Sequence, residues 1–195
     1  MQRDTLCYAI IQAVKINRNF SGNRQRWIKA PLASDRYRNW LMEQGSLTAR
    51  LQQKYADFYV EPVCIHYQKP ASEEIAAMHI PEQCQAQIRE VLLYGSGRPV
   101  VFAHSVLPRR SMRGEWHKLG RLGSKPLGAV LFASAQVRRT PLSYKKLSPH
   151  HVLYQKAVRY LAEKPQYLWA RRSIFSLNDA GIMVVEVFLP ELLRT

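Results

Sequence analysis

The stretch QIREVLLYGSGRPVVFAHSVL, residues 87–107, decides the fold class. Its two halves are runs rich in Val, Leu, Phe and Tyr, and Gly95-Ser-Gly-Arg98 separates them. Apolar runs on either side of a short turn that contains glycine are typical of a β-hairpin. We therefore predict two antiparallel strands, over 87–94 and 99–107.

A second hairpin is predicted near the C-terminus. Residues 168–177 and 182–189 are apolar runs, and Asn178-Asp-Ala-Gly181 between them has the composition of a turn. Upstream, residues 58–67 alternate with the two-residue period of a strand that Pro62 interrupts. Residues 135–139 are a further candidate strand, and 127–132 is too short to assign.

Two short helices are predicted at 35–42 and 47–55, because Ser34 and Ser46 stand at their capping positions. Further helical segments are expected over 6–14, 72–78 and 151–163. Strands joined mainly by hairpins, with helices between them, indicate an α+β domain, in which the helices pack on an antiparallel sheet.

The totals fit one domain. The chain has 195 residues, of which 47% are hydrophobic and 22% charged, and no apolar run approaches the roughly 18 residues of a membrane-spanning helix. The N-terminus lacks the features of a signal peptide. Cys7, Cys64 and Cys84 are scattered, which argues against a disulfide framework or a zinc site and favours the cytoplasm. We divide the chain into a basic lead-in, 1–30, and a domain, 31–195.

The formal net charge of +15 indicates an anionic partner. The basic residues concentrate in three stretches, 17–29, 109–125 and 138–146. These stretches are either a solvated surface that keeps the protein soluble or sites for nucleic acid, a membrane surface or a small acidic substrate.

Two charges interrupt the apolar strands, and a charge there is costly to bury unless it has a partner or a function. Arg89 is an outward-facing surface arginine, one partner of a weak cross-strand ion pair, or a guanidinium that binds a carboxylate in a pocket. Glu186 is the only charge in 182–189 and shares a face with Val184 and Phe188. It is a solvated carboxylate, a partner of Arg89, or a general acid in an apolar site.

Other motifs carry less information. The loop 122–128 is rich in Gly and Pro and could direct backbone N–H groups at an anion, but it lacks the ending of a phosphate loop. The six histidines show no metal-binding spacing, and neither a nucleophile elbow nor a dinucleotide fingerprint is present. We therefore expect no metal and no cofactor.

Several short motifs occur in order from Trp27 to the C-terminus. They are Trp40-Leu, Gly45-Ser-Leu-Thr-Ala-Arg-Leu51, Arg89-Glu-Val-Leu-Leu93, Gly97-Arg-Pro99, Val106-Leu-Pro108, Leu119-Gly, Lys125-Pro-Leu-Gly128, Leu131-Phe132, Leu168-Trp-Ala-Arg-Arg-Ser173 and Glu186-Val-Phe-Leu-Pro190. This ordered set resembles the chorismate pyruvate-lyase family. The resemblance implies helical flaps over an enclosed site and the conversion of chorismate to 4-hydroxybenzoate and pyruvate, the opening step of ubiquinone synthesis in bacteria.

The resemblance also implies roles for individual residues. Arg89 corresponds to the arginine that binds the ring carboxylate, and Glu186 to the glutamate that faces the ring oxygen, so both are the expected catalytic residues. The backbone amides of Leu47 and Leu127 are expected to help hold the carboxylate. His104 stands where the family often has an arginine.

Two other functions fit part of the sequence. Effector-binding domains of some bacterial transcription regulators have a similar fold, but the residues before Pro31 are too few for a DNA-binding domain. The charge and the helix pair at 34–55 suggest nucleic-acid binding, yet no aromatic and basic recognition motif is present. We expect a cytoplasmic monomer that converts chorismate and has no specific nucleic-acid partner. Its basic stretches are candidates for contact with a membrane or a pathway enzyme.

Overall fold

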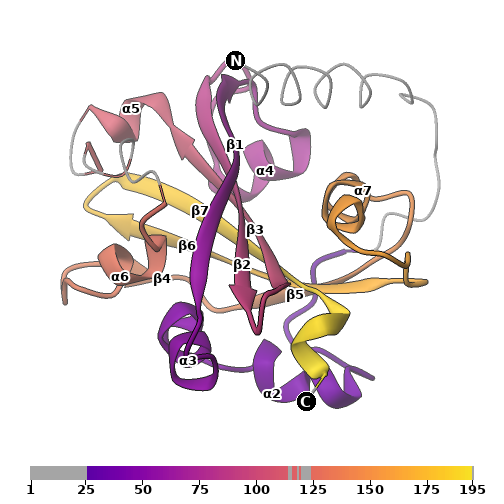
Figure 1. Cartoon of the computed structure of the whole chain (residues 1–195). Coiled ribbons are helices and arrows are strands. Elements are labelled where there is room, and N and C mark those ends of the chain that lie inside the picture. Colours follow the sequence, from indigo (N-terminus) through magenta and orange to yellow (C-terminus); the bar gives the residue numbers. More distant parts are fainter. Residues whose placement is uncertain (1–25, 114–115, 118, 120–123, 195) are drawn as a thin grey trace, which may run out of the picture.

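The computed structural model describes residues 26–113, 116–117, 119 and 124–194 (Figure 1). The predicted helix over 6–14, most of the basic stretch 17–29 and part of the stretch 109–125 lie outside the described residues. The end of the lead-in joins the sheet, because Ile28 and Tyr144 exchange backbone hydrogen bonds of 2.8 and 2.9 Å. The boundary between the lead-in and the domain stays a prediction.

One antiparallel sheet of seven strands forms the centre of the protein, in the order β1-β2-β3-β7-β6-β4, and β5 also pairs with β6. The strands are β1 (Tyr59–Gln68), β2 (Ala86–Gly95), β3 (Arg98–Pro108), β4 (Arg138–Arg139), β5 (Ser143–Leu147), β6 (Leu168–Leu177) and β7 (Ala180–Phe188). Both predicted hairpins are present, so the predicted α+β class with an antiparallel sheet is confirmed.

The helices are short and lie around this sheet (Figure 1). They are η1 (Asp35–Tyr37), α2 (Arg38–Leu41), α3 (Leu47–Lys54), α4 (Ser72–Met78), α5 (Arg109–Met112), α6 (Leu127–Leu131), α7 (Val152–Ala157), η3 (Val158–Tyr160) and η4 (Pro190–Leu193). The segment 127–132, left unassigned from the sequence, is the helix α6. The predicted helix over 151–163 is shorter, and only two residues of the candidate strand 135–139 form β4.

Local chemistry explains where several elements begin and bend. Ser46 caps α3, because its hydroxyl accepts a hydrogen bond of 3.3 Å from the N–H of Ala49. The predicted cap at Ser34 is wrong, because that hydroxyl donates instead to the carbonyl of Pro31, at 2.8 Å. Pro62 cannot donate to its neighbour strand, and the register of β1 on β2 shifts there.

The turn between β2 and β3 requires a left-handed backbone at two consecutive residues. Ser96 has a φ of 52° and Gly97 a φ of 67°, which matches the favoured two-residue hairpin turn. Both N–H groups donate to the carboxylate of Asp57, each at 2.8 Å. The turn is therefore fixed from the loop before β1.

The two faces of the sheet pack against different helices. On one face, Ile88, Phe102 and Val185 belong to a core that α7 covers through Leu153 and Ala157. Successive residues of a strand point to opposite faces of the sheet. On the other face, the remaining strand side chains pack against α3 and α6 in two further clusters. In Figure 1, α7 and α6 accordingly lie on opposite sides of the sheet.

The scattered cysteines argued against a disulfide framework, and the structure differs from this expectation at one of them. Cys84 is free, whereas Cys64 takes part in a disulfide. Within the described ranges, no helix is both long enough and apolar enough to cross a membrane.

Candidate active site

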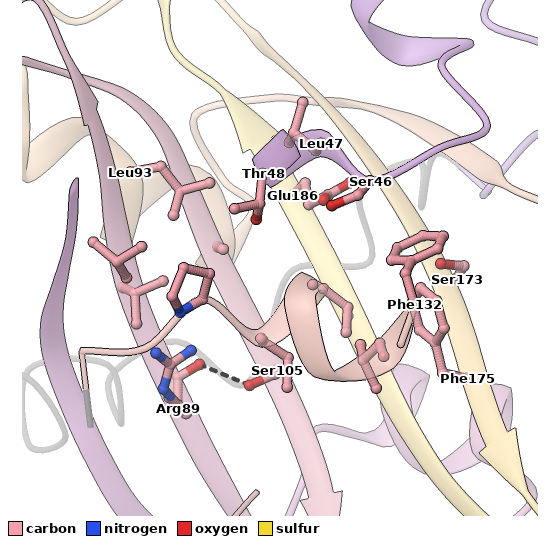
Figure 2. Close-up of a pocket in the computed structure, with 18 of the residues that line it drawn as sticks. Ser46, Leu47, Thr48, Arg89, Leu93, Ser105, Phe132, Ser173, Phe175 and Glu186 are labelled. Atoms are coloured by element: carbon pink, nitrogen blue, oxygen red, sulfur yellow. Dashed lines mark hydrogen bonds between the residues drawn. The ribbon is translucent and has the colours of Figure 1, made fainter. Parts of the chain in front are cut away.

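A cavity lies between the sheet and the starts of α3 and α6, on the face opposite α7 (Figure 2). About 630 Å³ in and around it is not filled by protein atoms, a volume that includes open solvent at its mouth. Most of its wall is apolar, and its polar side chains are few. The polar and charged residues of the wall are Ser46, Thr48, Arg89, Ser105, Arg139, Ser173 and Glu186.

Arg89 projects from β2 into this cavity and is only 6% exposed. Its Nη2 donates a hydrogen bond of 3.1 Å to the carbonyl of Lys125, which lies in the loop before α6. Burial lowers the pKa of Arg89 to about 10, so the guanidinium is still charged at neutral pH. A guanidinium that faces a cavity can also donate two parallel hydrogen bonds to a carboxylate there.

The starts of α3 and α6 meet beside Arg89. Leu47 and Leu127 are the first residues of these helices, and both line the cavity. A Cβ at Gly128 would lie 3.0 Å from Oγ of Ser46, so glycine permits the two helix ends to approach. The first N–H groups of a helix have no acceptor within it, and the backbone amides predicted to hold a carboxylate therefore lie at the cavity wall.

Glu186 lies on β7 and lines the same cavity, with its side chain 17% exposed. Its Oε2 accepts a hydrogen bond from Nε of Arg171, its neighbour on β6. Arg171 is completely buried, and its Nη1 also donates to the carbonyls of Trp40, Leu41 and Glu43. Arg171 therefore fixes Glu186 relative to the segment that leads into α3.

Arg89 is not the partner of Glu186. The strand β3 lies between β2 and β7, and Glu186 stands opposite Ala103 of β3, whereas Arg89 stands opposite Ser105. The interpretation of the two charges as a cross-strand pair is therefore wrong. They are two separate groups on one wall of the cavity (Figure 2).

His104 is not in the cavity, because β-strand alternation turns its side chain to the other face of the sheet. There its Nδ1 lies 2.9 Å from Glu90 and its Nε2 lies 2.9 Å from Glu74, and Lys156 of α7 also pairs with Glu90. Burial alone would lower the pKa of His104, but the two carboxylates outweigh it and raise the pKa to about 9. This buried network connects the sheet with α4 and α7.

We expect the free energy of unfolding to fall as the pH rises from about 6.5 to about 9. The histidine pKa is about 6.5 in an unfolded chain and about 9 in the fold. The stabilisation is therefore complete below pH 6.5 and is lost as His104 releases its proton, on the order of 1–3 kcal/mol. Urea unfolding at several pH values measures this change.

His104→Gln should remove most of that pH dependence, whereas His79→Gln, at an exposed histidine, should keep it. An unchanged pH dependence in His104→Gln would contradict the assignment to the buried network.

Two residues of the site had no role in the prediction from sequence. Arg171 belongs to the quoted motif 168–173 and lies on the same face of its strand as Trp169 and Ser173. Like Glu186, it is a charge in an apolar strand, and this feature could have identified it. Arg139 belongs to the basic stretch 138–146, where nothing distinguishes it from solvated neighbours. Among the described residues, no group of three His, Cys, Asp or Glu side chains is placed to hold a metal ion.

The fold and the site define an α+β protein with a mostly apolar cavity whose charged wall residues are two arginines and one glutamate, an arrangement that suits an anionic ligand. The family model described as chorismate lyase matches residues 23–195. The chain therefore belongs to the chorismate lyase family.

Relatives with curated names agree with this family. A probable chorismate pyruvate-lyase of Methylobacillus flagellatus is 44% identical over 171 residues, which cover 88% of this chain and 96% of the relative. Another, of Nitrosospira multiformis, is 46% identical over 170 residues, covering 86% and 94% of the two chains.

Solved structures share the fold with little sequence identity. The effector domain of PhnF from Mycobacterium smegmatis superposes with a TM-score of 0.57 at 12% identity, covering 77% of this chain and 91% of that one. A ligand-binding domain of a putative GntR-family transcriptional regulator from Bordetella bronchiseptica gives 0.52 at 15% identity, covering 69% and 86%. At such identities the likeness concerns the fold alone.

Proposed function

We propose that this protein converts chorismate to 4-hydroxybenzoate and pyruvate, without a cofactor, as the opening step of ubiquinone synthesis. The observation that carries the proposal is that Arg89, Glu186 and the starts of two helices line one cavity, in a member of the chorismate lyase family. We also propose that the enzyme acts in the cytoplasm and that its substrate is a free small molecule.

The ring carboxylate is assigned to Arg89 and to the backbone amides of Leu47 and Leu127. A guanidinium donates two parallel hydrogen bonds to a carboxylate, and the exposed N–H groups of helix starts add to them. Because Arg89 is bonded to the loop before α6 and α6 packs against α3, these donors belong to one connected wall. These donors fix the carboxylate end of the ring, and the apolar wall packs against the two faces of the ring.

Glu186 is assigned the proton transfer. In the reaction the C–O bond to the enolpyruvyl group breaks, the ring carbon that bears the hydroxyl loses one hydrogen, and the departing group gains one to become pyruvate. Arg171 pairs with Glu186 as a carboxylate through Oε2, which leaves Oε1 to take the ring proton and then to act as the general acid for the departing group. Formation of an aromatic ring supplies the driving force, so geometry and proton handling are what the protein adds.

The test is to incubate the purified protein with chorismate and to follow both products over time. We expect 4-hydroxybenzoate and pyruvate in equal amounts, at a rate far above that of chorismate in buffer. Saturable binding of 4-hydroxybenzoate without turnover would make the protein a sensor of aromatic acids. Neither binding nor turnover would contradict both functions.

A further inference from the structure

Arg139 is a second cavity arginine, on the edge strand β4, and none of the roles above includes it. Its Nε donates to Oγ of Ser173 at 2.9 Å, and its Nη1 donates to the carbonyl of Gln44 at 2.6 Å. The guanidinium also lies 5.5 and 5.1 Å from the ring centroids of Phe132 and Phe175, within the range of a cation–π contact. The side chain is therefore held in one position at the wall.

The charge of Arg139 lacks a bonded counter-ion. In the part of the chain that the structure describes, no carboxylate lies within salt-bridge distance of it. Burial lowers its pKa, an effect that the more distant Glu186 opposes and Arg171 reinforces. A half-buried guanidinium with fixed geometry and no adjacent acid is stabilised by an anion that enters the cavity.

Arg139 and Arg89 reach the cavity from different sides. Ser173, which accepts the hydrogen bond from Arg139, is aligned with Arg89 across the sheet. The paired residues run from Arg89 on β2 through β3 and β7 to Ser173 on β6. With strands about 4.8 Å apart, their backbones are separated by about 14 Å. Figure 2 shows Arg89 at one end of the cavity and Ser173, Phe132 and Phe175 at the other. Glu186, on β7, belongs to a strand between these ends.

We propose that Arg139 binds the second carboxylate of the substrate, the one on the enolpyruvyl group. This inference rests on the proposed function, in which Arg89 holds the ring carboxylate. Chorismate carries two carboxylates and 4-hydroxybenzoate one, so Arg139 distinguishes the dianionic substrate from the product. Once the C–O bond breaks, the carboxylate that Arg139 holds belongs to pyruvate.

Arg139→Gln should raise KM for chorismate by about tenfold to a hundredfold, the size of one charge-assisted pair. The Kd of 4-hydroxybenzoate should change by less than about threefold, because the product lacks the second carboxylate. Arg138→Gln is the matched control: it removes the same charge from the adjacent exposed residue, which does not line the cavity. We expect that control to keep both constants near their original values.

A ligand pair tests the same contact in the unaltered protein. Benzoate with a 3-(1-carboxyvinyloxy) group carries both carboxylates. The analogue in which the carboxyl group of the vinyloxy substituent is replaced by an amide carries only the ring carboxylate. The unaltered protein should bind the dianion at least about tenfold more tightly than the amide, and Arg139→Gln should abolish that preference.

Equal affinities of the unaltered protein for the two benzoates would overturn the proposal, whether or not Arg139→Gln folds. Equal losses of 4-hydroxybenzoate and dianion affinity in Arg139→Gln would also overturn it, because the residue would then only support the wall. The proposed function fails separately, if the unaltered protein releases no product from chorismate while its preference for the dianion persists.

Discussion

Glu186→Gln is expected to lower kcat for chorismate by about 100-fold to 10,000-fold, the usual contribution of a positioned proton-transfer group. The amide has the size of the carboxyl group and can still accept a hydrogen bond from Arg171, so the wall should stay intact. What it cannot do is take a proton from the ring and return it to the departing group. Steady-state formation of 4-hydroxybenzoate and pyruvate measures the loss.

The binding of 4-hydroxybenzoate and the unfolding midpoint of Glu186→Gln separate chemistry from folding. Both should stay close to those of the unaltered protein. Glu163→Gln is the control, because Glu163 is exposed and does not line the cavity. If Glu186→Gln turns chorismate over at a nearly normal rate, Glu186 is not the proton-transfer group.

The elements that the sequence predicted well depend on neighbouring residues. Glycine in the turn at 95–98 and the apolar runs beside it specify the hairpin of β2 and β3 without reference to the rest of the chain. Ser46 caps α3 through a residue only three positions away. The bend at Pro62 likewise follows from a missing N–H group within the strand.

What the sequence did not reveal depends on strand order. Arg89 and Glu186 line one cavity because β3 of the first hairpin pairs with β7 of the second, an arrangement that no local pattern encodes. In the same way, the basic stretch 138–146 contains Lys145, which is buried and paired with Glu73 at 2.8 Å, and Arg139, which lines the cavity. The run of positive charge therefore combines residues that face solvent with residues that face the interior.

Arg89→Ala should weaken the binding of 4-hydroxybenzoate and of chorismate together, by roughly 30-fold to 1,000-fold. Removing one partner of a buried, hydrogen-bonded charge pair costs about 2–4 kcal/mol, and Arg89 is only 6% exposed. Because the pKa of Arg89 is about 10, the guanidinium is charged at neutral pH, where calorimetric titration with the product measures the loss.

Arg98→Ala is the control for Arg89→Ala, since Arg98 is an exposed arginine at the opposite end of the same hairpin. It removes an equal charge and should leave product affinity unchanged. The comparison with Arg139→Gln adds a second constraint: loss of Arg89 should affect monoanion and dianion alike, and loss of Arg139 only the dianion. If a folded Arg89→Ala protein binds 4-hydroxybenzoate normally, Arg89 does not hold the ring carboxylate, and the orientation assigned to the ring is wrong.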